Sequence, residues 1–261
     1  MFRWGLYSLR NLWARRVTTA LTVVGLGLVV FVLLAVLMLA HGLEQTLGKT
    51  GDPENVIILR KGALSEIGSS LSREEIRAVA AQPDVRLTAD GRPLAVAEVG
   101  LQLTLRKGQG GSLTSVTLRG TAPEALAVRP AIRLIQGRLW KPGTTEIVVG
   151  ASIARQFPDA RVDRVLHFGN WAWTVVGVFE AGGSGFDSEV WGDAEQFLAT
   201  FQRTTFSSLT LRLAQPAMLP AFKDRIERDP RFKLSVKREP EYYEGKAEGL
   251  ARMIRVTGLF L

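Results

Sequence analysis

The sequence predicts an α+β protein with a transmembrane helix near its N-terminus, an extracytoplasmic mixed α/β domain, and the start of a second transmembrane helix at its C-terminus. Three observations lead to this fold class. The 27 residues from Val17 to Leu43 contain no Asp, Glu, Lys or Arg. The long middle of the chain alternates short strand patterns with short helix patterns. The last residues become apolar again after a basic pair.

The apolar run near the N-terminus is long enough to cross a membrane. Its core, Leu21 to Ala40, has 20 predominantly apolar residues, which at about 1.5 Å each cover the ~30 Å hydrocarbon core of a bilayer. A cleaved signal peptide is the alternative, but its apolar region is roughly 7–15 residues long. We therefore expect a retained helix over residues 17–43, in which Gly25 and Gly27 allow close helix packing.

Residues 1–16 set the orientation of this helix. They carry four arginines and no acidic residue, and positive residues stay on the cytoplasmic side of a membrane. The N-terminus is therefore expected in the cytoplasm of a cell (inner or plasma) membrane, with the main domain extracytoplasmic. Apolar residues at spacings of three and four also predict a cytoplasmic or interfacial amphipathic helix over residues 1–16.

The composition excludes several classes of function. The chain has no cysteine, which removes disulfide scaffolds, thiol nucleophiles and cysteine-based metal sites. The formal net charge is +8, but four of these charges lie in the first 16 residues, and no basic run in residues 44–240 exceeds two. A nucleic-acid-binding protein would present a basic stripe, so no nucleic-acid partner is predicted.

Residues 44–240 are expected to form the extracytoplasmic domain. A strand over 55–60, a helix over 72–81 and a strand over 85–87 form a first β-α-β unit, and Ser72 with Glu75 supplies a capping box for its helix. A strand over 207–213, a helix over 218–228 and a strand over 232–236 form a second unit. The residues between them predict a β-rich insert, with turns at Gly108–Gly111 and Gly169–Asn170.

Residues 241–261 are expected to form a stalk helix that leads into a second transmembrane helix. Charged residues at helical spacing are followed by Arg252 and Arg255, and then by six uncharged, mostly apolar residues. A hydrophobic C-terminus packed on the domain is the alternative. On the first interpretation the chain stops just inside its second span, as a fragment or as a natural truncation.

No residue pattern predicts catalysis or a bound cofactor. His41 and His167 are isolated from one another and from other ligands, so no metal site is expected. The loop at Gly182–Gly185 lacks the Gly-Lys-Ser/Thr ending of a phosphate loop and is expected to be a flexible surface loop. No Gly-x-Ser-x-Gly sequence is present. Catalytic, cofactor-binding and metal-ligating residues are therefore all predicted to be absent, and the chain is not expected to be an enzyme.

Several short motifs follow one another in a distinctive order. The first is Leu9–Arg16 followed by Thr19–Leu26, a basic helix that leads into a membrane span. The second comprises Leu118–Thr121, Ile135–Trp140 and Glu146–Gly150, and the third is Trp173–Phe179. Together, and behind a membrane helix, these motifs resemble the permeases of MacB/FtsX-type ABC transporters and their periplasmic core domain.

The resemblance implies a four-span permease whose large extracytoplasmic domain lies between the first two spans. Such a permease works with a separate cytoplasmic ABC ATPase subunit, a second permease subunit as a homo- or heterodimer, in some cases a periplasmic adaptor protein, and the surrounding membrane lipid. ATP hydrolysis then moves the outer domain mechanically, for export or extraction of substrate. No Walker A sequence occurs in the chain, so a fused nucleotide-binding domain is not expected.

On this interpretation the important residues are structural. Gly120, Gly137, Gly150 and Gly177 are expected at backbone turns or close contacts, and the loop Gly182–Phe186 is expected to contact an outer partner. Two other functions remain open from the sequence. One is a membrane-anchored extracytoplasmic binding or sensor module without transport activity, and the other is a membrane-tethered hydrolase that uses one of the serines.

Overall fold

The computed structural model describes residues 16–108, 111–168 and 170–259 of the 261-residue chain. The chain divides into two compact units, one formed by residues 46–246 and the other by the residues before and after them. Most of the helix expected over residues 1–16, part of the turns at Gly108–Gly111 and Gly169–Asn170, and the last two residues lie outside the described residues.

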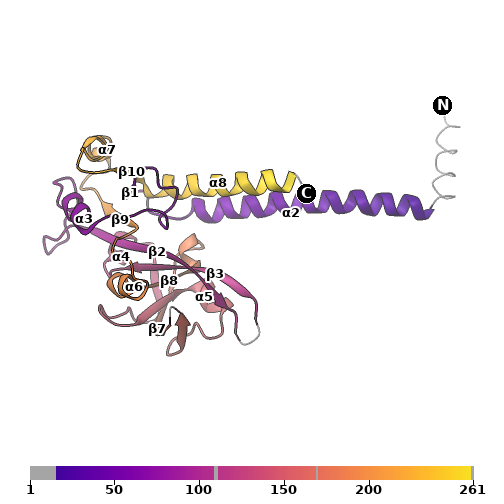
Figure 1. Ribbon diagram of the computed structural model, residues 1–261, viewed down its shortest axis with the longest axis horizontal. Coiled ribbons are helices and arrows are strands. Elements are labelled where there is room, and N and C mark those ends of the chain that lie inside the picture. Colours follow the sequence, from indigo (N-terminus) through magenta and orange to yellow (C-terminus); the bar gives the residue numbers. More distant parts are fainter. Residues whose placement is uncertain (1–15, 109–110, 169, 260–261) are drawn as a thin grey trace. The chain divides into compact units, whose positions relative to one another are not determined.

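The smaller unit contains most of two helices, α2 (Arg16–Gly48) and α8 (Glu239–Leu259). Among the described helices, α2 is the one long and apolar enough to cross a membrane, and only 6 % of its most apolar window is buried. Within this unit α8 runs beside α2 (Figure 1), and Arg255 forms an ion pair with Glu44. Ala40 and Ala251 are fully buried, as small residues are where helices approach closely.

The larger unit is built on a ten-stranded sheet with the order β10-β1-β9-β2-β3-β8-β5-β7-β4, and β6 pairs with β7. Its strands are β1 (Asn55–Arg60), β2 (Ala95–Arg106), β3 (Leu113–Thr121), β4 (Arg133–Gly137), β5 (Glu146–Gly150), β6 (Val165–Phe168), β7 (Trp171–Glu180), β8 (Glu189–Asp193), β9 (Ser208–Arg212) and β10 (Leu234–Arg238). Its helices are α3 (Arg73–Ala80), α4 (Ala125–Val128), α5 (Ala151–Gln156), α6 (Ala194–Thr200) and α7 (Leu219–Arg228), with 3₁₀ turns at Gly185–Ser188 and Pro216–Met218.

Two β-α-β units are interleaved at one end of this sheet. The first is β1-α3-β2 and the second is β9-α7-β10. Strand β1 pairs antiparallel with both β9 and β10, and β9 pairs antiparallel with β2. The two strands of each unit are therefore parallel and are separated by a strand of the other unit, which is the split β-α-β arrangement. The elements from β3 to α6 form an insert between β2 and β9.

The helix α3 begins as its sequence predicts. The backbone N–H of Glu75 donates to the Ser72 hydroxyl at 3.2 Å, and the N–H of Ser72 donates to the Glu75 carboxylate at 2.8 Å. The prediction of a strand over residues 85–87 is wrong, because Val85 and Leu87 make only isolated bridges. The partner of β1 in its unit is instead the much longer β2, whose residues 95–98 pair with β9.

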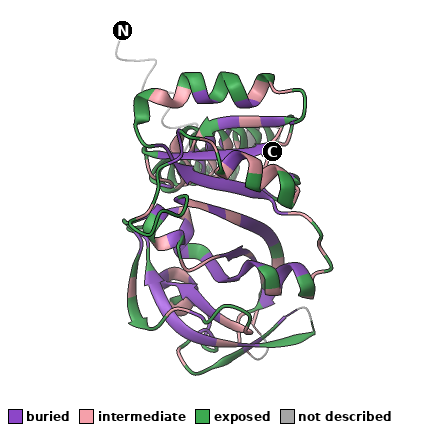
Figure 2. Ribbon diagram, turned by 90° about the vertical axis from the view of Figure 1, so that its left-hand side faces the viewer, coloured by how far each residue is buried: buried purple, intermediate pink, exposed green. Residues whose placement is uncertain are grey.

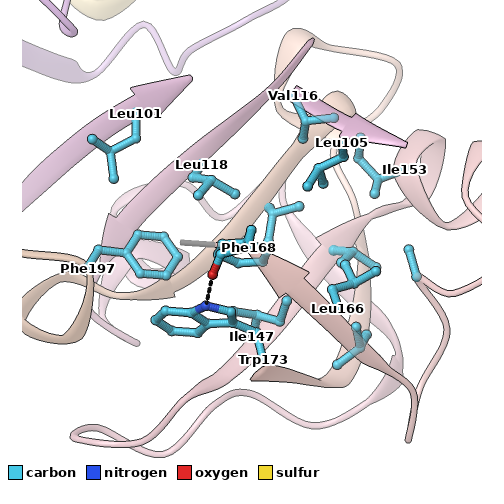
Figure 3. Packing of buried hydrophobic residues seen from close by; sticks show 14 of the residues in the cluster. Leu101, Leu105, Val116, Leu118, Ile147, Ile153, Leu166, Phe168, Trp173 and Phe197 are labelled. Atoms are coloured by element: carbon cyan, nitrogen blue, oxygen red, sulfur yellow. Dashed lines mark hydrogen bonds between the residues drawn. The ribbon is translucent and has the colours of Figure 1, made fainter. Parts of the chain in front are cut away.

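Strand β2 belongs to both halves of the sheet. Its first residues, 95–98, pair with β9, and residues 99–106 pair with β3. The core of the insert lies on this second part (Figure 3). The Trp173 ring stacks on Phe168 with centroids 5.1 Å apart and meets Phe197 edge-on at 4.9 Å. Its indole N–H donates to the Phe168 carbonyl at 3.2 Å, so the largest core side chain is also satisfied as a donor.

A second core lies beneath α3 and α7, where β1, β9 and β10 contribute Ile58, Leu211 and Val236, all at most 1 % exposed. Figure 2 shows the division: the strands are largely buried, and the helices turn exposed residues outward. This is the arrangement expected when amphipathic helices cover a sheet.

The glycines singled out from the sequence lie where a side chain would collide with neighbouring atoms. An added Cβ would come within 2.3 Å of the Asp187 carbonyl oxygen at Gly150 and within 2.1 Å of the Val176 carbonyl oxygen at Gly137. Gly137 also has a φ of +74°, which favours glycine. Gly120 and Gly177 are packed against neighbouring atoms in the same way. The expectation of backbone turns or close contacts at all four is confirmed.

Candidate functional site

Two arginines are buried in the interior of the larger unit. Arg119 lies on β3, and Arg129 follows α4; both side chains are 2 % exposed. Helix α4 ends at Arg129 because Pro130 disfavours the helical conformation in the residue before it, and Arg129 has the extended φ of −121°. A buried charge is tolerated only when it is paired and hydrogen-bonded, so the partners of these two residues define the site.

Arg119 is surrounded by carboxylates from three different segments. Its Nε and Nη2 donate to the two oxygens of Glu189 at 2.7 and 2.9 Å. Its Nη1 donates to Glu66 at 2.6 Å and to Glu98 at 3.3 Å. The Tyr243 hydroxyl lies 3.3 Å from Nη2. The guanidinium therefore holds together β8, β2 and the loop that follows β1.

Arg129 makes an equally complete set of contacts. Its Nη1 and Nη2 donate to the two oxygens of Glu98 at 2.9 and 2.8 Å, a bidentate pair. Its Nε donates to Glu239 at 2.8 Å, and Nη2 also reaches the Thr210 hydroxyl at 3.2 Å. Charge-assisted bidentate pairs of this kind are strong and geometrically specific.

Glu239 extends the network to the segment that follows α2. This glutamate is the first residue of α8, where Pro240 suits the opening turn because its missing N–H has no partner to lose. Its second oxygen accepts from the Asn55 side chain at 2.7 Å and from the backbone N–H of Asp52 at 2.9 Å. Arg212 of β9 then donates to the Asp52 carboxylate at 2.5 Å and to the side-chain amide oxygen of Asn55 at 2.9 Å.

We refer to these side chains together as the ionic cluster: Asp52, Asn55, Glu66, Glu98, Arg119, Arg129, Glu189, Arg212 and Glu239. All of them belong to the larger unit. They come from the segment after α2, from both β-α-β units, from the insert and from the first residue of α8.

Aromatic rings cover the cluster on one side. The Phe186 ring lies 5.2 Å from the Arg119 guanidinium carbon and 5.0 Å from that of Arg129, both within cation–π range. The Trp191 indole N–H donates to Glu189 at 2.8 Å. These rings exclude water, and in a low-dielectric interior the hydrogen bonds between charges are stronger and unpaired charges are more costly.

Arg129 and Arg119 determine the charge state of Glu98. Burial raises the pKa of this wholly buried carboxyl, but the two guanidinium charges outweigh it and lower the pKa to about 2 from its ordinary 4.5. Burial also raises the pKa of the Tyr243 hydroxyl. Glu98 is therefore a carboxylate and Tyr243 a neutral phenol at neutral pH.

Acid is expected to destabilise the larger unit through Glu98. The pKa of Glu98 is lower in the folded chain than in the unfolded chain. Its contribution to stability is therefore complete above pH 4.5 and is lost as the pH falls toward 2. Urea unfolding of the detergent-solubilised chain at about pH 6 and about pH 3 measures this loss. Glu98→Gln should flatten the pH dependence. The control Glu195→Gln should flatten it much less, because Arg73 also lowers the pKa of Glu195 but solvent screens this exposed pair. If Glu98→Gln loses as much unfolding free energy between the two pH values as the unsubstituted chain does, other groups cause the acid destabilisation.

The loop Gly182–Phe186 has an internal role, so the expectation that it is flexible is wrong, whereas its contact with an outer partner, for which Gly182 and Gly183 are exposed, stays a prediction. The Asp187 carboxylate accepts the backbone N–H groups of Ala181 and Gly183, both at 2.7 Å. The Gly185 N–H donates to the Thr50 hydroxyl at 2.8 Å, and Phe186 is only 3 % exposed. The loop is ordered by these bonds and positions the ring that covers both arginines.

The sequence did not predict the ionic cluster. His41 lies on α2, 3.0 Å from the Gln45 side chain, and His167 lies far along the chain on β6; among the described residues no group of acidic, histidine or cysteine side chains could hold a metal ion. The one local clue was the presence of charged residues within apolar strand patterns: Glu98 lies in β2 and Arg119 in β3, each beside buried residues. Their partners lie up to 124 residues away in the sequence.

Residues 19–229, most of the chain, match the MacB-like periplasmic core domain. The chain belongs to this family. The resemblance to MacB/FtsX-type permeases is thereby confirmed, and the chain contains the MacB-like domain of the ABC transporter permease family. No curated protein matches the chain.

Two solved structures share the MacB-like fold. The extracellular domain of the noncanonic ABC-type transporter YknZ from Gram-positive bacteria has a TM-score of 0.54 at 14 % identity, covering 70 % of this chain and 99 % of that one. The periplasmic region of MacB from Actinobacillus actinomycetemcomitans also has a TM-score of 0.54, at 13 % identity, covering 72 % and 90 %. The predicted mixed α/β fold behind an apolar N-terminal helix is confirmed.

Proposed function

We propose that this chain is the N-terminal part of a MacB/FtsX-type ABC transporter permease subunit, and that it transmits movement of its two long helices to its outer domain. A separate cytoplasmic ATPase would drive the movement, for export or extraction of a substrate. The observation that carries the proposal is the position of Glu239. This residue begins α8 and bonds both Arg129 of the insert and the Asp52–Asn55 segment that follows α2.

The physical basis is the cost of separating buried charges. If the first turn of α8 moved away from Arg129, two desolvated charges would lose their partners, and breaking a buried pair costs about 3–5 kcal/mol. If the insert moves together with the first turn of α8, Arg129 and Glu239 stay paired and this cost does not arise. The cluster therefore favours motion of the helix ends and the insert as one body, and a displacement that starts in α2 or α8 would be passed outward.

The arrangement in the cell follows from the same proposal. Residues 1–16 lie at the cytoplasmic surface, residues 17–43 cross the membrane, residues 44–240 form the extracytoplasmic domain, which is periplasmic in a Gram-negative cell, and residues 241–261 form the stalk and enter the second span. The partners are the ATPase, a second permease subunit, an adaptor outside the membrane, and lipid. The arginine-rich start of the chain supports this orientation.

A cross-linking experiment tests the transmission. The chain has no cysteine, so Glu44→Cys with Arg255→Cys places one unique pair on α2 and α8. We expect that changing the cross-linker length in detergent-solubilised chain will alter amide hydrogen exchange in β2, β3 and the α4–β4 segment. With Glu239→Gln added, the change should be confined to the helices, whereas Glu195→Gln as control should preserve it. Exchange in the insert that is the same for short and long cross-linkers would overturn the proposal and favour an anchored binding or sensor module.

A further inference from the structure

A pocket of about 390 Å³ opens beside the edge of the sheet, and none of its lining residues belongs to the ionic cluster. Three segments of the larger unit form it: β1 with the loop that follows, β10, and the first turns of α8. The lining residues are Leu59, Arg60, Gly62, Ala63, Leu64, Ser235, Lys237, Tyr242, Gly245 and Lys246. Its volume is within the range of small-molecule sites, roughly 300–1,000 Å³.

The polar side of this pocket is positively charged. Lys237 and Lys246 approach it from β10 and α8, and within the described part of the chain neither forms an ion pair or a hydrogen bond through its side chain. Arg60 is already bound by both oxygens of Glu75, at 2.8 and 2.7 Å. No acidic residue lines the pocket. Two lysines therefore line the pocket, and no acidic residue among its lining balances their charge.

The remaining lining is apolar. Leu59 and Tyr242 are buried in its wall, 3 % and 5 % exposed, whereas Leu64 is 95 % exposed. An apolar side chain that is almost wholly in solvent beside a pocket can lose that exposure when an apolar ligand covers it. Gly245 leaves the α8 side open, because an added Cβ there would meet no atom within 4 Å.

We propose that this pocket binds an amphiphilic anion, with a phosphate or carboxylate group held by Lys237 and Lys246 and a short alkyl or aromatic body against Leu59, Leu64 and Tyr242. The ligand can be a free amphiphile or an anionic lipid, which share this chemistry. The inference goes beyond the proposed function: it uses no residue of the ionic cluster and needs no transmitted motion, so either can fail while the other holds.

Binding of hexyl phosphate tests the proposal on the full chain in nanodiscs of zwitterionic phosphatidylcholine, by saturation-transfer NMR and calorimetry. We expect hexyl phosphate to bind at least tenfold more tightly than inorganic phosphate or hexanol, because each of those supplies only half of the interaction. Lys237→Ala and Lys246→Ala should each weaken binding about tenfold. Lys61→Ala, an exposed lysine outside the pocket lining, should leave it unchanged.

A second variant fills the pocket without removing charge. Gly245→Leu should abolish hexyl phosphate binding, and the fold should tolerate it because the position is open and leucine favours a helix more than glycine does. Gly249→Leu is the matched control: it is also on α8, is equally open and does not line the pocket. Unweakened binding in Gly245→Leu, or hexyl phosphate no tighter than inorganic phosphate, would overturn the site.

The source of the ligand is distinguished by adding anionic phosphatidylglycerol to the nanodiscs. A weaker apparent affinity for hexyl phosphate would mean that a bilayer lipid competes for the pocket. An unchanged affinity would identify a free amphiphile as the ligand. Both results support the site, since each requires hexyl phosphate binding that depends on Lys237 and Lys246.

Discussion

Arg129→Met is expected to lower the free energy of unfolding by about 3–5 kcal/mol, because removing one partner of a buried ion pair leaves the other charge without compensation. Arg129 is the bidentate partner of Glu98 and the guanidinium partner of Glu239, and both carboxylates are 0 % exposed. Methionine fills much of the volume but donates no hydrogen bond. Urea denaturation of the detergent-solubilised chain, followed by tryptophan fluorescence, measures the loss.

The matched control is Arg73→Met. Arg73 also forms a bidentate pair, with Glu195 at 2.6 Å, but the two side chains are 44 % and 55 % exposed. An exposed pair of this kind contributes about 0–1 kcal/mol. Equal effects of the two substitutions would mean that water reaches the ionic cluster, and would remove the physical basis for rigid transmission through it.

Gly150→Ala is expected to lower the free energy of unfolding by about 3 kcal/mol or more, at or beyond the upper end of ordinary overpacking. The new Cβ would lie 2.3 and 2.5 Å from the carbonyl oxygen and carbon of Asp187. Those are backbone atoms, so no side-chain rotation can relieve the contact. Thermal unfolding compared with the unsubstituted chain gives the magnitude.

Gly249→Ala provides the contrast for this prediction. Gly249 lies inside α8 with open space around it, so alanine should stabilise the helix by up to about 1 kcal/mol. Opposite signs for the two substitutions are expected. A small effect of Gly150→Ala would show that the 3₁₀ turn Gly185–Ser188 can shift away from β5, and the position of Phe186 over the arginines would then be less constrained than the structure indicates.

The sequence by itself determined the features whose causes lie within a few residues of one another. An uninterrupted apolar run gives α2, the Ser72–Glu75 capping box starts α3, and alternation of apolar residues gives strands such as β2 and β3. The glycines were singled out differently, by the resemblance of their motifs to a known family, and their close contacts, such as that of Gly150 with Asp187, are made with residues distant in the sequence. Helix period, strand period and capping are short-range effects.

Only the tertiary structure decided how these elements combine. Three residues at 85–87 have strand-forming character, but the register with β9 selects β2. Glycines at 182–185 suggest a flexible loop, but Asp187 and Thr50 order it from inside. Arg129 and Glu239 are 110 residues apart and meet only because the two β-α-β units interleave. Long-range strand pairing carries no local sequence pattern, so the ionic cluster and the pocket beside β10 become visible only in the folded chain.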